Sequence, residues 1–165
     1  MTRTRYRIEL GTRAFEHISA LAMQARPAET GGILLGYRQD DLYVVTHALA
    51  IDTDSSSAHH YVRDDRRANT VLAQFLADRE DDDPIGYIGE WHTHTAAHGP
   101  SRLDHRTMAA IARISSQPVS LIVHAVDHSD VLFGVIAKRR RFGRITTDAV
   151  AVHRPAGPKP NHEKG

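Results

Sequence analysis

The sequence predicts a single α/β domain of the α+β type, in which a mixed β-sheet packs against helices. Apolar runs typical of strands occur together with amphipathic segments of helical spacing. Several strand-like runs follow one another across tight turns, which favours antiparallel pairs within the sheet. The chain has 165 residues, of which 41% are hydrophobic and 25% charged, the size and balance of one globular domain with its own core.

The N-terminal part predicts a strand followed by a helix. Residues 6–10 alternate in polarity and end at Gly11, as expected for a short strand. Thr12 is expected to cap the helix that follows. The apolar positions of this helix keep helical spacing: Phe15, Ile18, Leu21 and Ala22. His17 lies in the same helix and is expected to be a surface or half-buried residue rather than a ligand.

A strand pair comes next. Residues 33–35 form a continuous apolar run, which is typical of a strand covered on both faces. Residues 40–41 predict a turn into a longer strand over residues 42–51, antiparallel to the first. Glu29 precedes this pair and is followed closely by two glycines. A single Glu before a strand is usually solvated, so Glu29 by itself is weak evidence for a functional site.

Residues 52–60 are polar and predict a loop, and residues 63–80 predict an amphipathic helix. The apolar face of that helix is formed by Ala68, Val71, Leu72, Phe75 and Leu76. The acidic run 81–83, followed by Pro84, is expected to be a solvated turn. His59 and His60 are adjacent, so as strand-like residues they face opposite ways and do not bind one metal together. His60 is a candidate for the rim of a substrate site, with an ordinary loop as the competing interpretation.

The C-terminal part predicts strands over residues 118–125 and 131–137, joined by a turn at 127–130, and a short closing strand over residues 150–152. His124 lies on an apolar strand and is expected to be a core histidine. The domain is predicted to span residues 1–153, and the proline-rich residues 154–165 to form a flexible tail.

The charge balance favours neither nucleic acid nor membrane as a partner. Lys and Arg number 21 and Asp and Glu 20, and the basic cluster at residues 138–144 is most simply a solvated hairpin. No apolar run approaches the ~20 residues that span a bilayer, and the N-terminus has no apolar signal core, so a cytoplasmic location is expected. The absence of cysteine excludes disulfides and thiolate zinc sites.

Residues 90–104 contain the candidate metal site. A buried strand is predicted from Ile85 onward, and because side chains alternate along a strand, His92 and His94 point to the same side. After a loop with Gly and Pro, Asp104 begins a segment of helical spacing. Two imidazoles and one carboxylate make the ligand set of a catalytic zinc site, in which a fourth position is left to water.

Each part of this pattern also has an ordinary explanation. Two histidines separated by one residue are common on exposed strands. Ser101 and Asp104 match a capping box, in which the serine caps a helix and the acid bonds back to the cap's amide. Together with Glu29 upstream, however, the combination favours a metal site.

Residues 29–36, 89–94 and 100–104 together resemble the JAB/MPN (JAMM) metalloprotease family, in its prokaryotic branch. The family motif consists of a distant Glu, His-x-His, and Ser-x-x-Asp after a short loop, and all parts occur here in that order. The resemblance implies a fold similar to cytidine deaminases, a curved mixed sheet between helices. The loop departs from the pattern: the family usually has seven residues starting with Pro, whereas Thr95 to Pro100 are six and start with Thr.

By position, the resemblance implies one zinc ion on His92, His94 and Asp104, with Glu29 as acid/base and Ser101 as the donor to an oxyanion. Active members hydrolyse the isopeptide or peptide bond after the C-terminal glycine of ubiquitin or a ubiquitin-like protein. Prokaryotic members accompany ubiquitin-like conjugation systems, some in antiphage defence, or process sulfur carriers. A ubiquitin-like protein or its conjugate is therefore the expected partner.

Other roles and functions stay open from the sequence. Glu90 faces the same side as His92 and is either outer support for the ligands or a core-edge carboxylate, and Thr93 is a weaker candidate beside it. A metal-free MPN-type binding scaffold is one alternative function. A nucleic-acid-linked protein is another, favoured only by residues 138–144. A deaminase is not expected, because the cysteine ligands of such sites are absent. Neither the identity of the ubiquitin-like partner nor the oligomeric state follows from the sequence.

Overall fold

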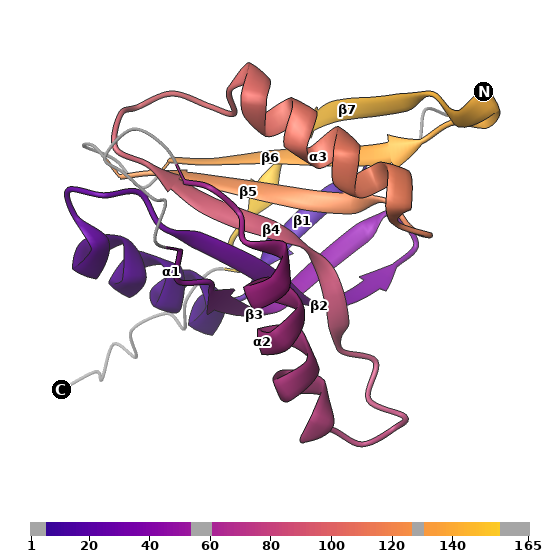
Figure 1. Ribbon diagram of the computed structural model, residues 1–165, viewed down its shortest axis with the longest axis horizontal. Coiled ribbons are helices and arrows are strands. Elements are labelled where there is room, and N and C mark those ends of the chain that lie inside the picture. Colours follow the sequence, from indigo (N-terminus) through magenta and orange to yellow (C-terminus); the bar gives the residue numbers. More distant parts are fainter. Residues whose placement is uncertain (1–5, 54–60, 127–130, 156–165) are drawn as a thin grey trace, which may run out of the picture.

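The computed structural model describes residues 6–53, 61–126 and 131–155. Within these residues, three α-helices pack on one eight-stranded mixed sheet (Figure 1). The elements in chain order are β1 (Arg7–Leu10), α1 (Thr12–Ala25), β2 (Gly31–Gln39), β3 (Leu42–Ala50), α2 (Asp65–Ala77), β4 (Gly86–His94), α3 (Arg102–Ile114), β5 (Val119–Ala125), β6 (Val131–Arg139), the 3₁₀ turn η1 (Arg141–Gly143), β7 (Ile145–Val150) and β8 (Val152–His153).

The sheet is curved so strongly that its two edges meet. Its strand order is β7-β6-β5-β4-β2-β3-β1-β8, with β4–β5, β1–β3 and β1–β8 parallel and the other pairs antiparallel. β7 ends at Val150 and β8 begins at Val152, yet these strands lie at opposite ends of that order. Because two residues span at most about 7 Å, the sheet must curl until its edges are neighbours. The amide of Ile8 donates to the carbonyl of Ala151 (3.1 Å) at this closure.

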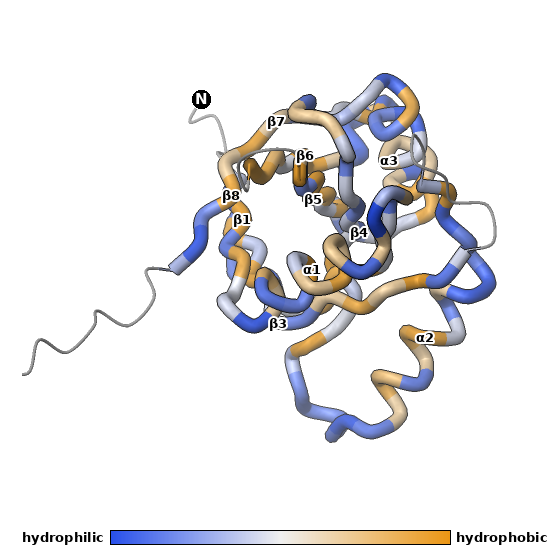
Figure 2. The backbone as a smooth tube through the Cα atoms, turned by 90° about the vertical axis from the view of Figure 1, so that its left-hand side faces the viewer, coloured by the Kyte–Doolittle hydropathy of each residue, from blue (hydrophilic) through white to orange (hydrophobic). Residues whose placement is uncertain are grey.

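The two faces of the sheet carry separate cores. On one face, α1 packs Ile18 against Leu34, Trp91 and Ile122. On the other face, α3 covers β5 and β6, and its Met108 is in the core cluster that contains these strands (Figure 1). α2 also lies on this second face, where its buried Ala68 joins a smaller cluster with β2. Figure 2 shows hydrophobic and hydrophilic residues alternating along α2, as its half-buried position requires. The predicted mixed sheet with packed helices is confirmed at this level.

Three local predictions differ from the structure. Gly11, not Thr12, is the N-cap of α1, since its carbonyl accepts the first helical bond from Phe15 while its own amide is bound to β3. The predicted closing strand 150–152 is split between β7 and β8, and most of β7 was missed because its Thr-Thr-Asp segment lacks apolar alternation. Leu76, expected on the apolar face of α2, is exposed.

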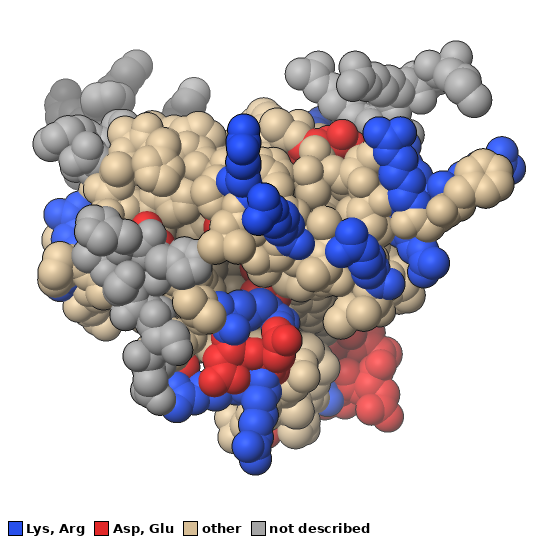
Figure 3. Space-filling model, turned by 45° about the horizontal axis from the view of Figure 1, so that its top comes forward, with Lys and Arg blue, Asp and Glu red and all other residues tan. Residues whose placement is uncertain are grey.

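The basic cluster forms a hairpin, as predicted. Residues 138–144 span the end of β6, η1 and the approach to β7. Asp148 on β7 neutralises two of these cations, lying 3.5 Å from both Lys138 Nζ and Arg140 Nη2. Figure 3 shows Lys and Arg side chains spread over this face, with Asp and Glu side chains beside those near its centre. None of the described helices is long and apolar enough to cross a membrane.

The close pairing of β4 with β5 depends on Gly89. A Cβ atom there would lie 2.1 Å from the carbonyl oxygen of Ser120, so Gly89→Ala forces the two strands apart. We expect a loss of about 3 kcal/mol of unfolding free energy in urea titrations. Gly86 begins the same strand with nothing within 4 Å of its virtual Cβ, so Gly86→Ala is the matched control and is expected to change stability by about 1 kcal/mol at most. Equal effects of the two substitutions would contradict this account.

Candidate metal centre

The histidine pair occupies the end of β4, a strand in the interior of the sheet. His92 pairs with Gly31 of β2 on one side and with Val123 of β5 on the other. The alternation of β4 buries Trp91 in the core under α1, while His92 and His94 point to the opposite face, toward α3. Both imidazoles are buried, with exposed fractions of 7% and 4%. A strand bonded on both sides therefore holds both rings rigidly.

Asp104 completes a compact group of three ligands. Its Oδ1 lies 3.3 Å from His92 Nε2, and its Oδ2 lies 3.4 Å from His94 Nε2. The two Nε2 atoms are 3.1 Å apart. In the described part of the chain, this group alone brings three His, Cys, Asp or Glu side chains close enough to hold a metal ion together. The predicted convergence of these three residues is confirmed.

The spacing of the donor atoms fits zinc. Zinc bonds of about 2.0–2.1 Å at tetrahedral angles place neighbouring ligand atoms about 3.3 Å apart. The two Nε2 atoms are 3.1 Å apart, and each lies at a similar distance from one oxygen of Asp104, 3.3 Å from Oδ1 for His92 and 3.4 Å from Oδ2 for His94. Two imidazoles and a carboxylate are also ligand types that zinc accepts. The donor set is therefore suited to zinc with a fourth position left over.

The capping box of α3 orients Asp104. The amide of Ser101 donates to Asp104 Oδ2 (2.6 Å), and the amide of Asp104 donates to Ser101 Oγ (3.2 Å). Burial raises the pKa of Asp104, but hydrogen bonds with His92 and His94 and the bond from the Ser101 amide outweigh it and hold the pKa well below its usual range. The carboxylate is thus charged and aimed at the imidazoles.

The tautomer of His94 is fixed by the loop. Its Nδ1 lies 3.0 Å from the carbonyl oxygen of His98, which can only accept, so Nδ1 carries the proton and Nε2 offers its lone pair to the cluster. Burial lowers the pKa of His94, yet the bonds to Asp104 and to His98, with the charges of Asp104 and Glu29, raise it above 6.5 overall. Gly31 pairs with His92 and Thr30 is bonded to Thr93, so the backbone of Glu29 lies beside the end of β4 that carries the cluster.

Glu29 is buried directly before β2, with an exposed fraction of 6%. Its neighbour Thr30 is fastened to β4 by Thr93: the amide of Thr30 donates to Thr93 Oγ1 (3.0 Å), and the amide of Thr93 donates to the Thr30 carbonyl (2.8 Å). Thr93 lies between His92 and His94 but faces the other side of β4. It therefore supports the backbone beside Glu29 and does not contact the ligands.

Ser101 lies at the mouth of the site. Its side chain is exposed, and its oxygen accepts the Asp104 amide, so the hydroxyl proton stays available for donation. The loop from Thr95 to Pro100 is one residue shorter than the family usually has, yet His94 and Asp104 still meet across it. The ends of this loop are set by β4 and α3, which explains why the ligands tolerate its length.

Glu90 faces the same side of β4 as the histidines but has other partners. Its Oε1 accepts from the hydroxyl of Tyr87 (2.6 Å) and lies 3.0 Å from Arg63 Nε. Burial raises the pKa of Glu90, while the charge of Arg63 and the bonds from Tyr87 and Arg63 oppose the rise. Glu90 thus forms an ion pair above the strand, and its partners are Arg63 and Tyr87 rather than the imidazoles.

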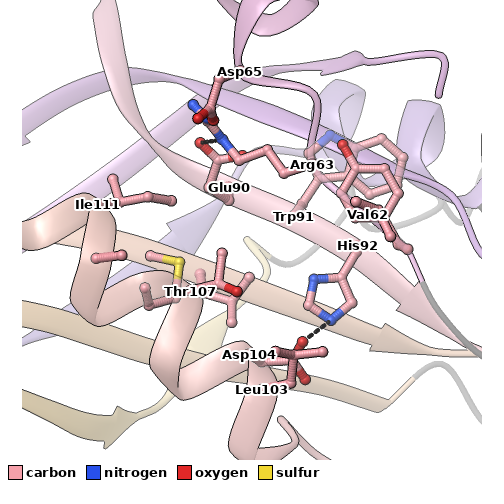
Figure 4. Close-up of a pocket in the computed structure, with 14 residues that line it drawn as sticks. Val62, Arg63, Asp65, Glu90, Trp91, His92, Leu103, Asp104, Thr107 and Ile111 are labelled. Carbon is pink, nitrogen blue, oxygen red and sulfur yellow. Dashed lines mark ion pairs between the residues drawn. The ribbon is translucent and has the colours of Figure 1, made fainter. Parts of the chain in front are cut away.

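A cavity of about 310 Å³ opens beside the ligands. Its walls are the segment Tyr61–Asp65 and the buried side of α3, and its floor is formed by β4 and Leu121 (Figure 4). His92 and Asp104 line one part of it, and Arg63 and Glu90 another. The ring of Tyr61 stacks on His92 at a centroid distance of 6.1 Å and an interplanar angle of 18°. The site therefore consists of a candidate metal-binding cluster at one side of a half-open groove.

Sequence reasoning did not find Tyr61, Arg63 or the carbonyl of His98 as parts of the site. Tyr61 and Arg63 precede α2 without any motif, and a backbone carbonyl leaves no mark in a sequence. The candidate His60 lies outside the described residues. His17 is exposed, and His124 is buried in the core beside Phe15, as predicted.

Comparison with known proteins agrees with this geometry. The family model for prokaryotic homologues of the JAB domain matches residues 11–141. The chain belongs to this family. The solution structure of a protein from Desulfitobacterium hafniense is similar to the chain at a TM-score of 0.67 and 20% sequence identity, covering 96% of this chain and 99% of that one. At this identity the likeness shows that the JAB-family chain shares the fold of that protein. No curated protein matches.

Zinc binding by this JAB-family chain is expected to weaken as the pH falls. Zinc needs the bare Nε2 of His94, and the pKa of His94 is raised above 6.5, so protons compete already near neutral pH. Below that pKa, we expect affinity to fall about tenfold per pH unit for each proton displaced. Competition with a chromophoric chelator between pH 8 and pH 5.5 measures this. His17→Ala, which removes an exposed imidazole, should leave the curve unchanged. A flat profile would refute the assigned ligands.

Proposed function

We propose that this JAB-family chain is a zinc-dependent peptidase or isopeptidase that hydrolyses the bond after the C-terminal glycine of a ubiquitin-like protein. The observation that carries the proposal is the cluster of His92, His94 and Asp104 with the buried carboxylate of Glu29 near it. A catalytic zinc site needs three protein ligands and a positioned acid/base, and these four residues supply both.

The ligands would hold a single zinc ion per chain. Zinc in such a site lowers the pKa of a water molecule to about 7 and polarises a carbonyl group. Glu29 then takes the proton of the attacking water and gives it to the leaving amine. A positioned proton transfer of this kind contributes about 10²–10⁴-fold in rate. The burial of Glu29 and the two hydrogen bonds between Thr30 and Thr93, one of them to the Thr93 hydroxyl, keep the carboxylate in place for both transfers.

Ser101 stabilises the charge that develops on the carbonyl oxygen. Its hydroxyl donates toward the substrate while its oxygen remains bound to the Asp104 amide. By analogy with other oxyanion donors, this bond contributes about 3 kcal/mol to the transition state. The groove beside His92 receives the extended C-terminal tail of the substrate, where glycines next to the cleaved bond let the backbone approach the ligands.

Within this proposal, the substrate is a ubiquitin-like protein or its conjugate in a bacterial conjugation or antiphage defence system, and the chain acts in the cytoplasm. A sulfur carrier with the same C-terminal glycine would use the same chemistry. We also propose that the curved sheet resembles that of cytidine deaminases.

The test of the acid/base role is Glu29→Gln. We expect the variant to keep its zinc in elemental analysis but to cleave a ubiquitin-like fusion about 10²–10⁴-fold more slowly, because the amide cannot carry the proton. The substrates are fusions of the ubiquitin-like proteins encoded beside the gene to a reporter. Glu16→Gln, at an exposed position of α1, is the matched control and should cleave normally.

Cleavage by Glu29→Gln at the wild-type rate would show that another group moves the proton. A purified wild-type chain that holds no zinc, cleaves none of the fusions and still binds one of them would replace the proposal by a binding scaffold.

A further inference from the structure

Side-chain contacts join the outer wall of the groove to the sheet. Residues 61–63 lead into α2, and within the described part of the chain they make no backbone–backbone hydrogen bond. Two side chains of this segment reach the floor of the groove on β4. Tyr61 stacks on His92, and Arg63 pairs with Glu90 at 3.0 Å (Figure 4). The position of the wall therefore depends on these two contacts.

The ion pair is the stronger of the two. Arg63 reaches from the surface, where it also pairs with the exposed Asp65, to Glu90, whose exposed fraction is only 5%. Tyr87 fixes the same carboxylate from below through its hydroxyl (2.6 Å). Buried charge pairs seldom add stability over apolar residues of the same volume, so their presence calls for another role.

The groove also contains unsatisfied polar atoms. Among the described residues, two buried side-chain atoms of the groove have no hydrogen-bond partner: Tyr61 Oη and Glu90 Oε2. Arg63 Nε is close to Glu90 but not aligned with it. A pair that served stability would satisfy these atoms. Their concentration beside the ligands indicates a pair that serves the site.

Tyr61 and His92 are packed closely against the backbone at Gly31. Gly31 lies below both rings, and a Cβ atom at Gly31 would come within 2.8 Å of Tyr61 and of the Cβ of His92. Any shift of the wall thus changes the packing of a ligand as well as the width of the groove.

We propose that Arg63 and Glu90 form a clasp, a pair of positioning residues that holds residues 61–63 over β4, sets the width of the substrate groove and keeps Tyr61 on His92. The clasp deepens the proposed function, because a groove of fixed width selects a slender, extended peptide tail. Its structural part, the fixed wall, does not depend on the chain being a peptidase.

The first experiment detects the wall directly. Arg63→Met removes the charge but keeps the length of the side chain, so the wall should open and expose the Tyr61–Val62 bond. We expect chymotrypsin to cut after Tyr61 about tenfold faster, as measured by mass spectrometry, with the thermal transition showing that the variant is folded. Arg66→Met makes the same change at an exposed position of α2 and should leave the rate unchanged. If Arg63→Met does not fold, Arg63→Lys is used, with a smaller acceleration expected.

The second experiment tests whether the two residues act together. Glu90→Gln should accelerate the same cut, and the double variant should be no faster than the faster single one, since both changes open one clasp. With a cleavable fusion, Arg63→Met should raise KM about tenfold and change kcat much less, because groove width affects binding before chemistry.

Three results would overturn the clasp: an unchanged cut after Tyr61 in folded Arg63→Met, an equal effect of Arg66→Met, or additive effects in the double variant. Failure of the proposed function gives a different result. The wild-type chain then cleaves no fusion, while Arg63→Met is still cut faster by chymotrypsin than the wild type.

Discussion

The carboxylate of Asp104 joins the end of β4 to the start of α3 across the loop between them. One of its oxygens accepts the amide of Ser101 and thereby closes the first turn of α3. Both oxygens face the imidazoles at the end of β4, at 3.3 and 3.4 Å. A capping box and a metal ligand are competing interpretations of Ser101 and Asp104 in the sequence. In the fold they are one arrangement, because the bond that caps the helix also aims the carboxylate.

The curvature of the sheet makes this meeting possible. β4 is bonded to β2 and to the parallel β5, so its C-terminal end is fixed from both sides. Closure of the sheet at β8 then leaves the two cores on opposite faces, α1 on one and α3 on the other. The alternation of β4 sends Trp91 into the first core and His92 toward α3. The positions of the two histidines are therefore set by the sheet, while α3 and the loop orient Asp104 and the His94 ring.

Charge in the site is arranged in two pairs along β4. Asp104 balances the histidine cluster, and Arg63 balances Glu90 two residues before His92. The desolvation cost of the second pair is not offset by full hydrogen bonding, since Glu90 Oε2 has no partner among the described residues. A protein that only needed stability would place apolar side chains there. The Arg63–Glu90 pair at the wall of the groove thus lowers the stability of the fold, and it lies close to the ligands.

The sequence by itself determined the local parts. The period of two in β4 placed His92 and His94 on one face, the capping box located the start of α3, and the order of the motif pointed to the family that the comparison with family models confirms. The β2–β3 pair, the core position of His124 and the basic hairpin also followed from local pattern. These features depend on residues close together in the chain, and periodicity reports on them directly.

The tertiary structure alone decided what depends on residues far apart. The pairing of β8 with β1, the strand Ile145–Val150, the placement of Tyr61 over His92 and the ion pair of Arg63 with Glu90 have no signal in local composition. For Glu90 the sequence leaves two roles open, outer support for the ligands or a core-edge carboxylate, and the segment that leads into α2 gives it Arg63 as a partner. The curvature of the sheet and the packing of its helices determine which side chains meet across the groove. Periodicity in the sequence reports on neighbours along the chain and not on these contacts.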